Sequence, residues 1–200
     1  MMMLAITWGN GRSTDVATTQ PVIKFTYEDY RTTPDDERYE LVDGDLIMVP
    51  APNLKHQAVL GRLHYHLQQF ITEHERGQLF LAPCDVVLSD TNVVQPDLLF
   101  VSRQREHLLS SGENVRGAPD LVIEILSPST AEKDRGGKLE LYGRHGVTEY
   151  WLVDPTGETI SIHRQRGDRL TATDTFGRGQ TLCSPLLAGL ELHLDDVFSS

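Results

Sequence analysis

The stretch "GAPDLVIEILSPST", residues 117–130, decides the fold of this chain. A Pro-Asp pair opens its apolar part, and aliphatic residues then run from Leu121 to Leu126, interrupted only by Glu124. Short apolar runs bounded by turn-forming residues are typical of β-strands. Burying a carboxylate in such a strand is costly unless a cation compensates its charge. The stretch therefore predicts a strand that presents Glu124, and the partner of that carboxylate is the question to answer.

Asp120 is the first candidate, because it lies four residues before Glu124. Side chains alternate along a strand, so the two carboxylates share a face but are about 13 Å apart. Ligands of Mg²⁺ lie about 2.0–2.1 Å from the ion, so these two cannot share one. We therefore interpret Asp120 as a turn or strand-entry residue and expect the partner of Glu124 elsewhere.

A second Pro-Asp pair, in "QPDLLFV", places Asp97 at the start of the preceding apolar strand. Neighbouring strands lie about 4.8 Å apart, so Asp97 and Glu124 meet on one face if their strands pair. A divalent metal ion is the simplest compensation for two facing carboxylates; an Arg or Lys partner, or hydrogen bonds at a sheet edge, is the alternative. Glu40, in the apolar setting of "RYELVDG", is a third candidate carboxylate.

The lysine that such a site would need is supplied by the segment after the strand. Asp134, Lys138 and Tyr142 recur every four residues and so share one face of a predicted helix. Either Lys138 reaches the carboxylates, or it forms an exposed ion pair with Asp134 that contributes only a few tenths of a kcal/mol. The sequence leaves both arrangements open.

The other elements follow from local patterns. Asp43-Gly44 between two short apolar runs predicts a β-hairpin over residues 38–50. Apolar residues at helical spacing predict a helix over 55–76 that Gly77 caps. Thr26 with Asp29, and Ser129 with Glu132, have the spacing of capping boxes, and the second pair predicts a helix from Ser127 to about Arg144. Further strands are predicted at residues 78–83, 85–89, 96–102, 149–155 and 159–164. This order predicts an α/β fold, a mixed sheet flanked by helices, in one domain over residues 21–200 after a flexible tail over residues 1–20.

Composition limits the function. The net charge of −11 argues against a protein that coats nucleic acid with broad basic surface, but not against an enzyme with a local basic group. Cys84 and Cys183 show no metal-ligand spacing and are expected to be reduced thiols. No signal peptide and no apolar stretch of membrane-spanning length is visible, so we expect a cytoplasmic protein with no membrane partner.

Together, the carboxylates and the helix lysine resemble the PD-(D/E)xK nuclease superfamily, and the flanking sequence is similar to its Uma-type branch of endonucleases. The similarity covers about residues 25–198, and its most specific part runs from "VIEILSPST" to "EYWLVDP". The other segments that carry it are "YELVDGDLIMVPAPNLKHQAVLGRL", "VVQPDLLFVS" and "SPLLAGLELHLDDVF".

The resemblance implies a restriction-endonuclease-like fold and hydrolysis of phosphodiester bonds in DNA with Mg²⁺ or Mn²⁺. It implies that Asp97 and Glu124 are metal ligands, that Glu40 contacts the metal or its waters, and that Lys138 positions or activates the attacking water. One departure is Leu126, which occupies the position where the usual motif has lysine, so activity depends on Lys138 reaching the site.

Two further residues have auxiliary assignments. His56 matches a histidine that recurs in this branch, and it either contacts a metal-bound water or phosphate or makes a local hydrogen bond at a helix start. Tyr142 is expected to pack in the core with its hydroxyl on Glu124 or Lys138.

Three functions remain open. A homodimeric metal-dependent DNA endonuclease is the leading hypothesis, since two sites can cut both strands. The alternative is an inactive or weakly active member of the fold that binds other proteins, which the net charge of −11 favours. A hydrolase of another phosphoester is the third. Clustering of Glu40, Asp97, Glu124 and Lys138 would favour an enzyme.

Overall fold

The computed structural model describes residues 23–34, 36–127 and 136–199. The predicted tail over residues 1–20, the capping box at Ser129 and Glu132, and Asp134 lie outside these ranges. The helix predicted to begin at Ser127 is not helical at that residue and is described from Gly137 on. The helices are α1 (Tyr27–Tyr30), α2 (Leu54–Glu73), the 3₁₀ helix η1 (Arg103–Leu109), α4 (Gly137–His145) and α5 (Leu194–Phe198). The strands are β1 (Tyr39–Val42), β2 (Asp45–Met48), β3 (Gly77–Leu81), β4 (Val86–Ser89), β5 (Asn92–Val94), β6 (Leu98–Ser102), β7 (Val115–Arg116), β8 (Leu121–Ile125), β9 (Glu149–Asp154), β10 (Thr159–Arg166), β11 (Arg169–Gly177), β12 (Thr181–Leu182) and β13 (Leu192–His193).

The strand predicted from the opening stretch, β8, lies inside a six-stranded sheet of order β11-β10-β9-β8-β6-β3. It pairs in parallel with β9 and antiparallel with β6, so the sheet is mixed as predicted. All five residues of β8 are buried. A strand with neighbours on both sides and layers on both faces needs apolar residues at every position, which explains the continuous apolar run.

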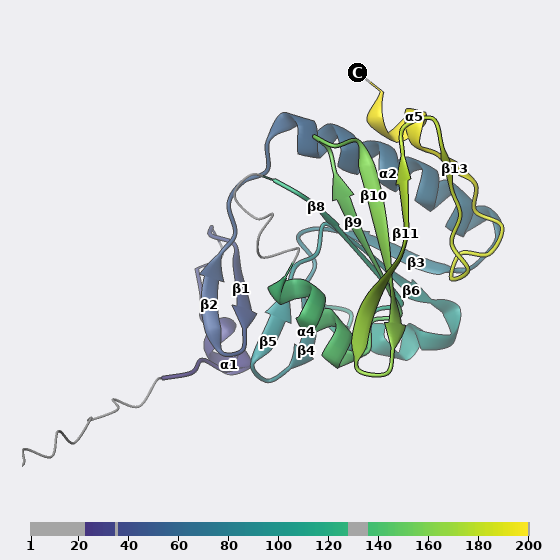
Figure 1. Cartoon of the computed structure of the whole chain (residues 1–200). Coiled ribbons are helices and arrows are strands. Elements are labelled where there is room, and N and C mark those ends of the chain that lie inside the picture. The colour runs from purple at the N-terminus through teal and green to yellow at the C-terminus, as the bar shows by residue number, and fades with distance from the viewer. Residues whose placement is uncertain (1–22, 35, 128–135, 200) are drawn as a thin grey trace, which may run out of the picture.

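The two faces of this sheet carry different layers (Figure 1). Helices α2 and α5 pack on one face, where Leu63 and Leu67 meet Ile123 and Ile125 of β8. On the other face, α4 and strands of a second sheet pack against Val122 and its neighbours. Within the ranges that the structure describes, no helix combines the length and the apolar character needed to cross a membrane.

The predicted hairpin is confirmed, but it belongs to the second sheet. Strands β1 and β2 pair from Tyr39↔Met48 to Val42↔Asp45. The two linking residues, Asp43 and Gly44, both have positive φ, as a two-residue hairpin turn requires. The five-stranded order is β2-β1-β5-β4-β7, and α1, whose Thr26–Asp29 capping box is present, packs beside it through Tyr30. The hairpin thereby brings Glu40 to the boundary between the two sheets.

The end of α2 corrects one prediction. The helix ends at Glu73 with His74 as its C-cap, and Gly77 does not cap it but begins β3. A Cβ at Gly77 would lie 2.2 Å from the backbone oxygen of Val101 on the neighbouring strand. Glycine is therefore required by the close approach of β6, a contact that no pattern near the helix end reveals.

Candidate functional site

The pairing of β6 with β8 brings the first two carboxylates together. Leu98 pairs with Ile123, and this antiparallel register sets Asp97 across from Glu124. Asp97 Oδ2 accepts a hydrogen bond of 2.8 Å from the backbone N–H of Ile125. The predicted meeting of the two Pro-Asp strands is thus present, and Asp97 is held by the backbone of the strand that carries Glu124.

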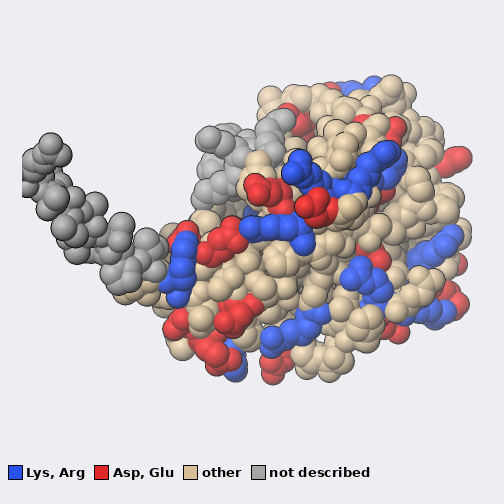
Figure 2. All heavy atoms as spheres, turned by 60° about the horizontal axis from the view of Figure 1, so that its bottom comes forward, with Lys and Arg blue, Asp and Glu red and all other residues tan. Residues whose placement is uncertain are grey.

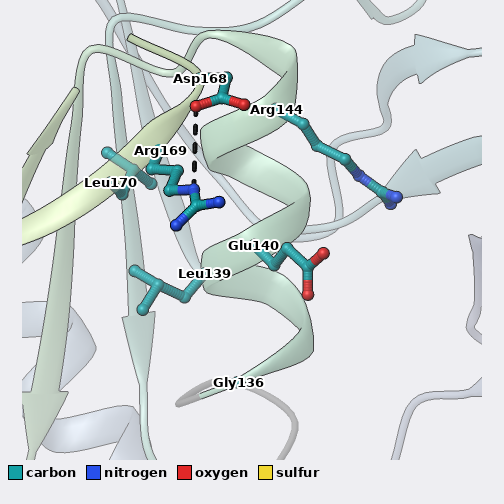
Figure 3. Close-up of a pocket in the computed structure, with 7 residues that line it drawn as sticks. All are labelled: Gly136, Leu139, Glu140, Arg144, Asp168, Arg169 and Leu170. Carbon is teal, nitrogen blue, oxygen red and sulfur yellow. Dashed lines mark ion pairs between the residues drawn. The ribbon is translucent and has the colours of Figure 1, made fainter. Parts of the chain in front are cut away.

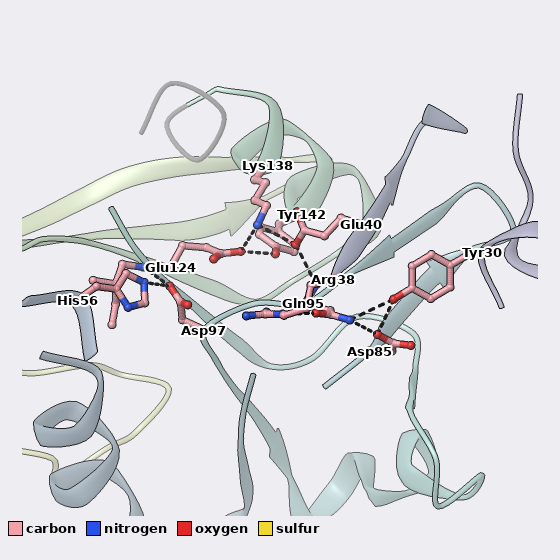
Figure 4. Close-up of polar contacts among 11 residues, drawn as sticks. Tyr30, Arg38, Glu40, His56, Asp85, Gln95, Asp97, Glu124, Lys138 and Tyr142 are labelled. Carbon is pink, nitrogen blue, oxygen red and sulfur yellow. Dashed lines mark hydrogen bonds and ion pairs between the residues drawn. The ribbon is translucent and has the colours of Figure 1, made fainter. Parts of the chain in front are cut away.

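Lys138 links the other two carboxylates (Figure 4). Its Nζ lies 2.9 Å from Glu124 Oε1 and 2.9 Å from Glu40 Oε1. Glu40 and Glu124 are 5 % and 4 % exposed, so both are taken out of water almost completely. The lysine side chain is also largely buried. The structure thus shows that Lys138 reaches the carboxylates, whereas Asp134 lies outside the described residues.

The packing of α4 explains how a lysine on a helix reaches a carboxylate on a strand. Leu141 and Tyr142 are fully buried against the sheet face that carries Val122 and Leu126. The Tyr142 hydroxyl donates a 2.7 Å hydrogen bond to Glu124 Oε1. Burial and the nearby negative charge of Glu124 raise the pKa of Tyr142 well above its usual value, so it stays protonated as a donor. Leu126, in the position of the usual lysine, belongs to this apolar layer.

His56 contacts Asp97 from the start of α2. Its backbone N–H donates to the side chain of Asn53, which caps the helix. Its Nε2 lies 3.0 Å from Asp97 Oδ2, and the residue is 6 % exposed. His56 therefore makes both a local hydrogen bond at the helix start and a side-chain contact to the acidic cluster, which consists of Glu40, Asp97 and Glu124. Nδ1 of this ring is buried and has no hydrogen-bond partner among the residues that the structure describes.

Asp120, which the distance argument set aside, lies apart from the cluster. Its side chain accepts a 2.8 Å hydrogen bond from the backbone N–H of Ser102 and a longer one from Arg105. The strand-entry interpretation is thereby confirmed. Asp154 is likewise a turn residue, since its Oδ1 accepts from the backbone N–H groups of Thr156 and Gly157.

A small cavity of about 50 Å³ lies at the cluster, lined by Asp97, Glu124, Lys138 and His56 among others. The carboxylates supply oxygen donors, the type that Mg²⁺ and similar hard cations prefer. Over the described ranges, no three His, Cys, Asp or Glu side chains are arranged as a metal site. Lys138 is bonded to two of the three carboxylates, Glu40 and Glu124.

Four residues near the cluster were missed by sequence reasoning. The backbone N–H of Gln95 donates to Glu40 Oε1 at 2.9 Å, and its side chain links Arg38, Asp85 and Tyr30. Tyr30, in α1, and Asp85, just before β4, are far apart in sequence and meet only when the second sheet forms (Figure 4). Gln95 directly precedes the Pro96-Asp97 pair, which is the signal that could have drawn attention to it.

A larger cavity of about 520 Å³ lies along the other side of α4 (Figure 3). Glu140 and Arg144 line it together with Asp168 and Arg169. The ion pair between Arg169 Nε and Asp168 Oδ1 spans 3.8 Å, and both side chains are more than four-fifths exposed. Such a pair contributes little in water, and the cavity holds none of the buried carboxylates. The acidic cluster, not this cavity, is the candidate site.

Comparison with known proteins agrees with the geometry. The sequence profile of the Uma2 family, described as "Putative restriction endonuclease", matches residues 26–195. The uncharacterized protein slr1290 of Synechocystis sp. is 26 % identical over 136 residues, which cover 66 % of this chain and 68 % of that protein.

A solved structure shares the fold. It is a crystal structure described as a "putative nuclease belonging to DUF820" from Anabaena variabilis, and it aligns with a TM-score of 0.72 at 23 % identity. The alignment covers 88 % of this chain and 98 % of that chain. The restriction-endonuclease-like mixed sheet flanked by helices is thereby shown for this protein, and the match over residues 26–195 shows that the chain belongs to the Uma2 family.

Proposed function

We propose that this protein is a metal-dependent endonuclease that hydrolyses phosphodiester bonds in DNA. The observation that carries the proposal is the position of Lys138, whose Nζ lies 2.9 Å from carboxylate oxygens of both Glu40 and Glu124. A lysine that simply balanced surface charge would remain in water, where such pairs contribute little. Here a basic group and several carboxylates converge at one buried point beside a cavity.

Asp97 and Glu124 are the proposed ligands of Mg²⁺ or Mn²⁺, and Glu40 is the third oxygen donor. When bound, such an ion polarises a phosphate oxygen and lowers the pKa of a coordinated water. The donor type fits the ion, since all three side chains offer carboxylate oxygens.

Each neighbouring residue then has a role that its contacts support. Ile125 N–H and His56 hold Asp97 in one orientation through Oδ2. Tyr142 orients Glu124 by donating to Oε1. Lys138 fixes a positive charge beside the carboxylates, where it can steady the negative charge that develops on a phosphate under attack and position the attacking water.

The test is cleavage of plasmid DNA in the presence of Mg²⁺ or Mn²⁺. Removing one preorganised electrostatic group from an active site slows catalysis by about 10²–10³. We expect slowing of this order for Glu124→Gln and for Lys138→Ala, and no cutting once the metal is chelated. Asp120→Asn is the matched control, because it alters a buried acid close to Glu124 in the sequence but outside the site.

Cleavage at the wild-type rate by both Glu124→Gln and Lys138→Ala would contradict the proposal. A folded wild-type protein that binds its metal but cuts no DNA would instead support the protein-binding alternative. Cleavage of small phosphodiesters without cleavage of DNA would identify the third possibility, a different phosphoester hydrolase.

A further inference from the structure

A third cavity, of about 370 Å³, adjoins the candidate site. Tyr27, Tyr30 and Tyr39 line it, together with Arg31 and the acidic residues Glu37, Asp85 and Glu113. Arg38 and Gln95 line both this cavity and the small cavity at the acidic cluster. The two hollows are therefore neighbours, with Arg38 and Gln95 at their boundary.

Arg38 is held at one end only. Its Nε donates a 3.0 Å hydrogen bond to Gln95 Oε1. Among the residues that the structure describes, the guanidinium makes no other hydrogen bond or ion pair. The terminal nitrogens of an arginine form a planar pair of donors that matches two oxygens of a phosphate. The bond to Gln95 thus fixes the orientation of the Arg38 guanidinium, and its terminal nitrogens can donate hydrogen bonds to an anionic ligand.

A partly buried network fixes Gln95 in turn. Its Nε2 donates to Asp85 Oδ1 at 2.8 Å and to the Tyr30 hydroxyl at 3.2 Å. The Tyr30 hydroxyl donates to the same Asp85 oxygen at 2.8 Å. Burial and the adjacent Asp85 raise the pKa of Tyr30, so it remains a protonated donor. This network orders the floor of the cavity before any ligand arrives.

The aromatic wall is also ordered. Tyr27 and Tyr30 are stacked with ring centroids 6.4 Å apart, and the Tyr27 hydroxyl accepts hydrogen bonds from Asn114 and Arg116. Tyr39 packs against the same cluster and is only partly buried, so part of its surface is open to a ligand. Rings that already pack against one another lose little conformational freedom when a planar group stacks on them.

We propose that this cavity is a subsite for one unpaired nucleotide next to the phosphodiester that is cut, with its base against the tyrosine rings and its phosphate on Arg38. The inference rests on the proposed nuclease function. A cavity of this volume lies within the range of small-ligand sites.

The negative net charge of the chain favours base stacking on the tyrosine rings as the main source of affinity for the nucleotide. With a net charge of −11, the protein lacks the broad basic surface that gives sequence-independent binding to the DNA backbone. Figure 2 shows Lys and Arg interspersed with Asp and Glu on the face in view, with no continuous basic stripe. Base stacking on aromatic side chains contributes affinity at each stacked base, and Arg38 supplies a local positive charge at this cavity. The substrate class that follows is single-stranded DNA, or duplex DNA with an unpaired nucleotide.

The first test measures binding without catalysis. The Glu124→Gln protein is titrated into a fluorescent single-stranded oligonucleotide in the absence of metal ions, and anisotropy is recorded. Adding Tyr39→Leu to this background should weaken binding by about tenfold, within the range of the loss when one stacked base contact is removed, and Arg38→Gln should weaken binding as well. Tyr65→Leu is the control, since Tyr65 lies exposed on α2 outside the cavity. Tyr39→Phe, which keeps the ring, should bind more tightly than Tyr39→Leu.

The second test locates the subsite on the DNA and needs no altered protein. A single abasic position is moved along the oligonucleotide, and both binding and the position of the cut are measured with wild-type protein. We expect a loss of binding at one position next to the cut and an unchanged response elsewhere. A uniform response at all positions, or equal binding by Tyr39→Leu, Arg38→Gln and Tyr65→Leu, would overturn the subsite.

The two proposals fail in different ways. If the single-strand binding depends on Tyr39 and Arg38 while no metal ion supports cleavage, the subsite stands and the nuclease function fails. If the DNA is cut by a Glu124-dependent reaction with no sensitivity to Tyr39, Arg38 or abasic positions, the nuclease function stands and the subsite is wrong.

Discussion

Replacing Lys138 by methionine should destabilise the fold, because it removes the positive charge that pairs with two buried carboxylates. Glu40 and Glu124 are 5 % and 4 % exposed, and Lys138 Nζ is bonded to both at 2.9 Å. Removing one partner of a buried ion pair typically costs about 3–5 kcal/mol. Gln95 N–H and the Tyr142 hydroxyl still donate to these carboxylates in the variant, which favours the lower part of that range.

Lys24→Met is the matched control. Lys24 Nζ also lies 2.9 Å from a carboxylate, Asp45, but the side chains are 45 % and 62 % exposed. Exposed pairs contribute about 0–1 kcal/mol. The two substitutions therefore remove ion pairs of equal length that differ in burial.

The assay is equilibrium unfolding in urea at neutral pH without divalent metal ions, followed by the fluorescence of the fully buried Trp151. With a urea dependence of about 2–3 kcal/mol per molar, Lys138→Met should lower the midpoint by about 1–2 M, and Lys24→Met by less than about 0.5 M. If Asp97 and Glu124 bind Mg²⁺ as proposed, adding Mg²⁺ should recover part of the loss. Equal midpoints for the two variants would refute the reasoning, because burial would then have no effect on what the lysine contributes.

Two further predictions concern stability. Gly77→Ala should destabilise the fold by more than about 1 kcal/mol, since its Cβ would lie 2.2 Å from Val101 O. Gly61→Ala, with nothing within 4 Å of its Cβ, should instead stabilise α2 by about 0.5–1 kcal/mol. Thermal unfolding of both variants checks this pair, and equal shifts in melting temperature would contradict it. Burial lowers the pKa of His163, so the unfolded chain binds more protons than the folded protein near and below pH 6.5. The stability that neutral His163 contributes is therefore fully present above that pH and is lost as the pH falls toward its folded-state pKa. His163→Gln should therefore show a smaller fall in melting temperature between pH 7.5 and pH 5.5 than the wild type, and an identical fall would contradict the prediction.

The buried polar residues of the candidate site stabilise the fold as well as forming the site. Its members come from β1, α2, β8, α4 and the residue before β6, and each holds another in place. Partly satisfied polar networks are costly in a low-dielectric interior. Substitutions in the site therefore change stability as well as activity, and activity losses have to be measured on variants shown to be folded.

Much of the fold follows from local pattern. The apolar run around Glu124 predicts β8, the Asp43-Gly44 pair predicts the first hairpin, and the spacing of Leu63 and Leu67 predicts the buried face of α2. These signals depend on alternation, helical periodicity and the backbone angles that a few residues allow. The exclusion of Asp120 and the selection of Asp97 also followed from strand geometry alone, since distances along and between strands hardly vary.

Other features were decided only when distant segments packed together. The sequence did not decide whether Lys138 reaches the carboxylates, and the docking of α4 on the sheet brings it to Glu124. The contacts of Gln95 with Arg38, Asp85 and Tyr30, and the need for glycine at position 77, arise between strands that are not neighbours in the chain. Periodicity records which face of an element is apolar, but not which other element that face will meet. The sequence by itself thus determined the first hairpin, the long helix α2 and the carboxylate that β8 presents. The tertiary structure determined that Lys138 is the cation beside this carboxylate, and it placed Arg38 between the acidic residues of the site and the cavity lined by Tyr27, Tyr30 and Tyr39.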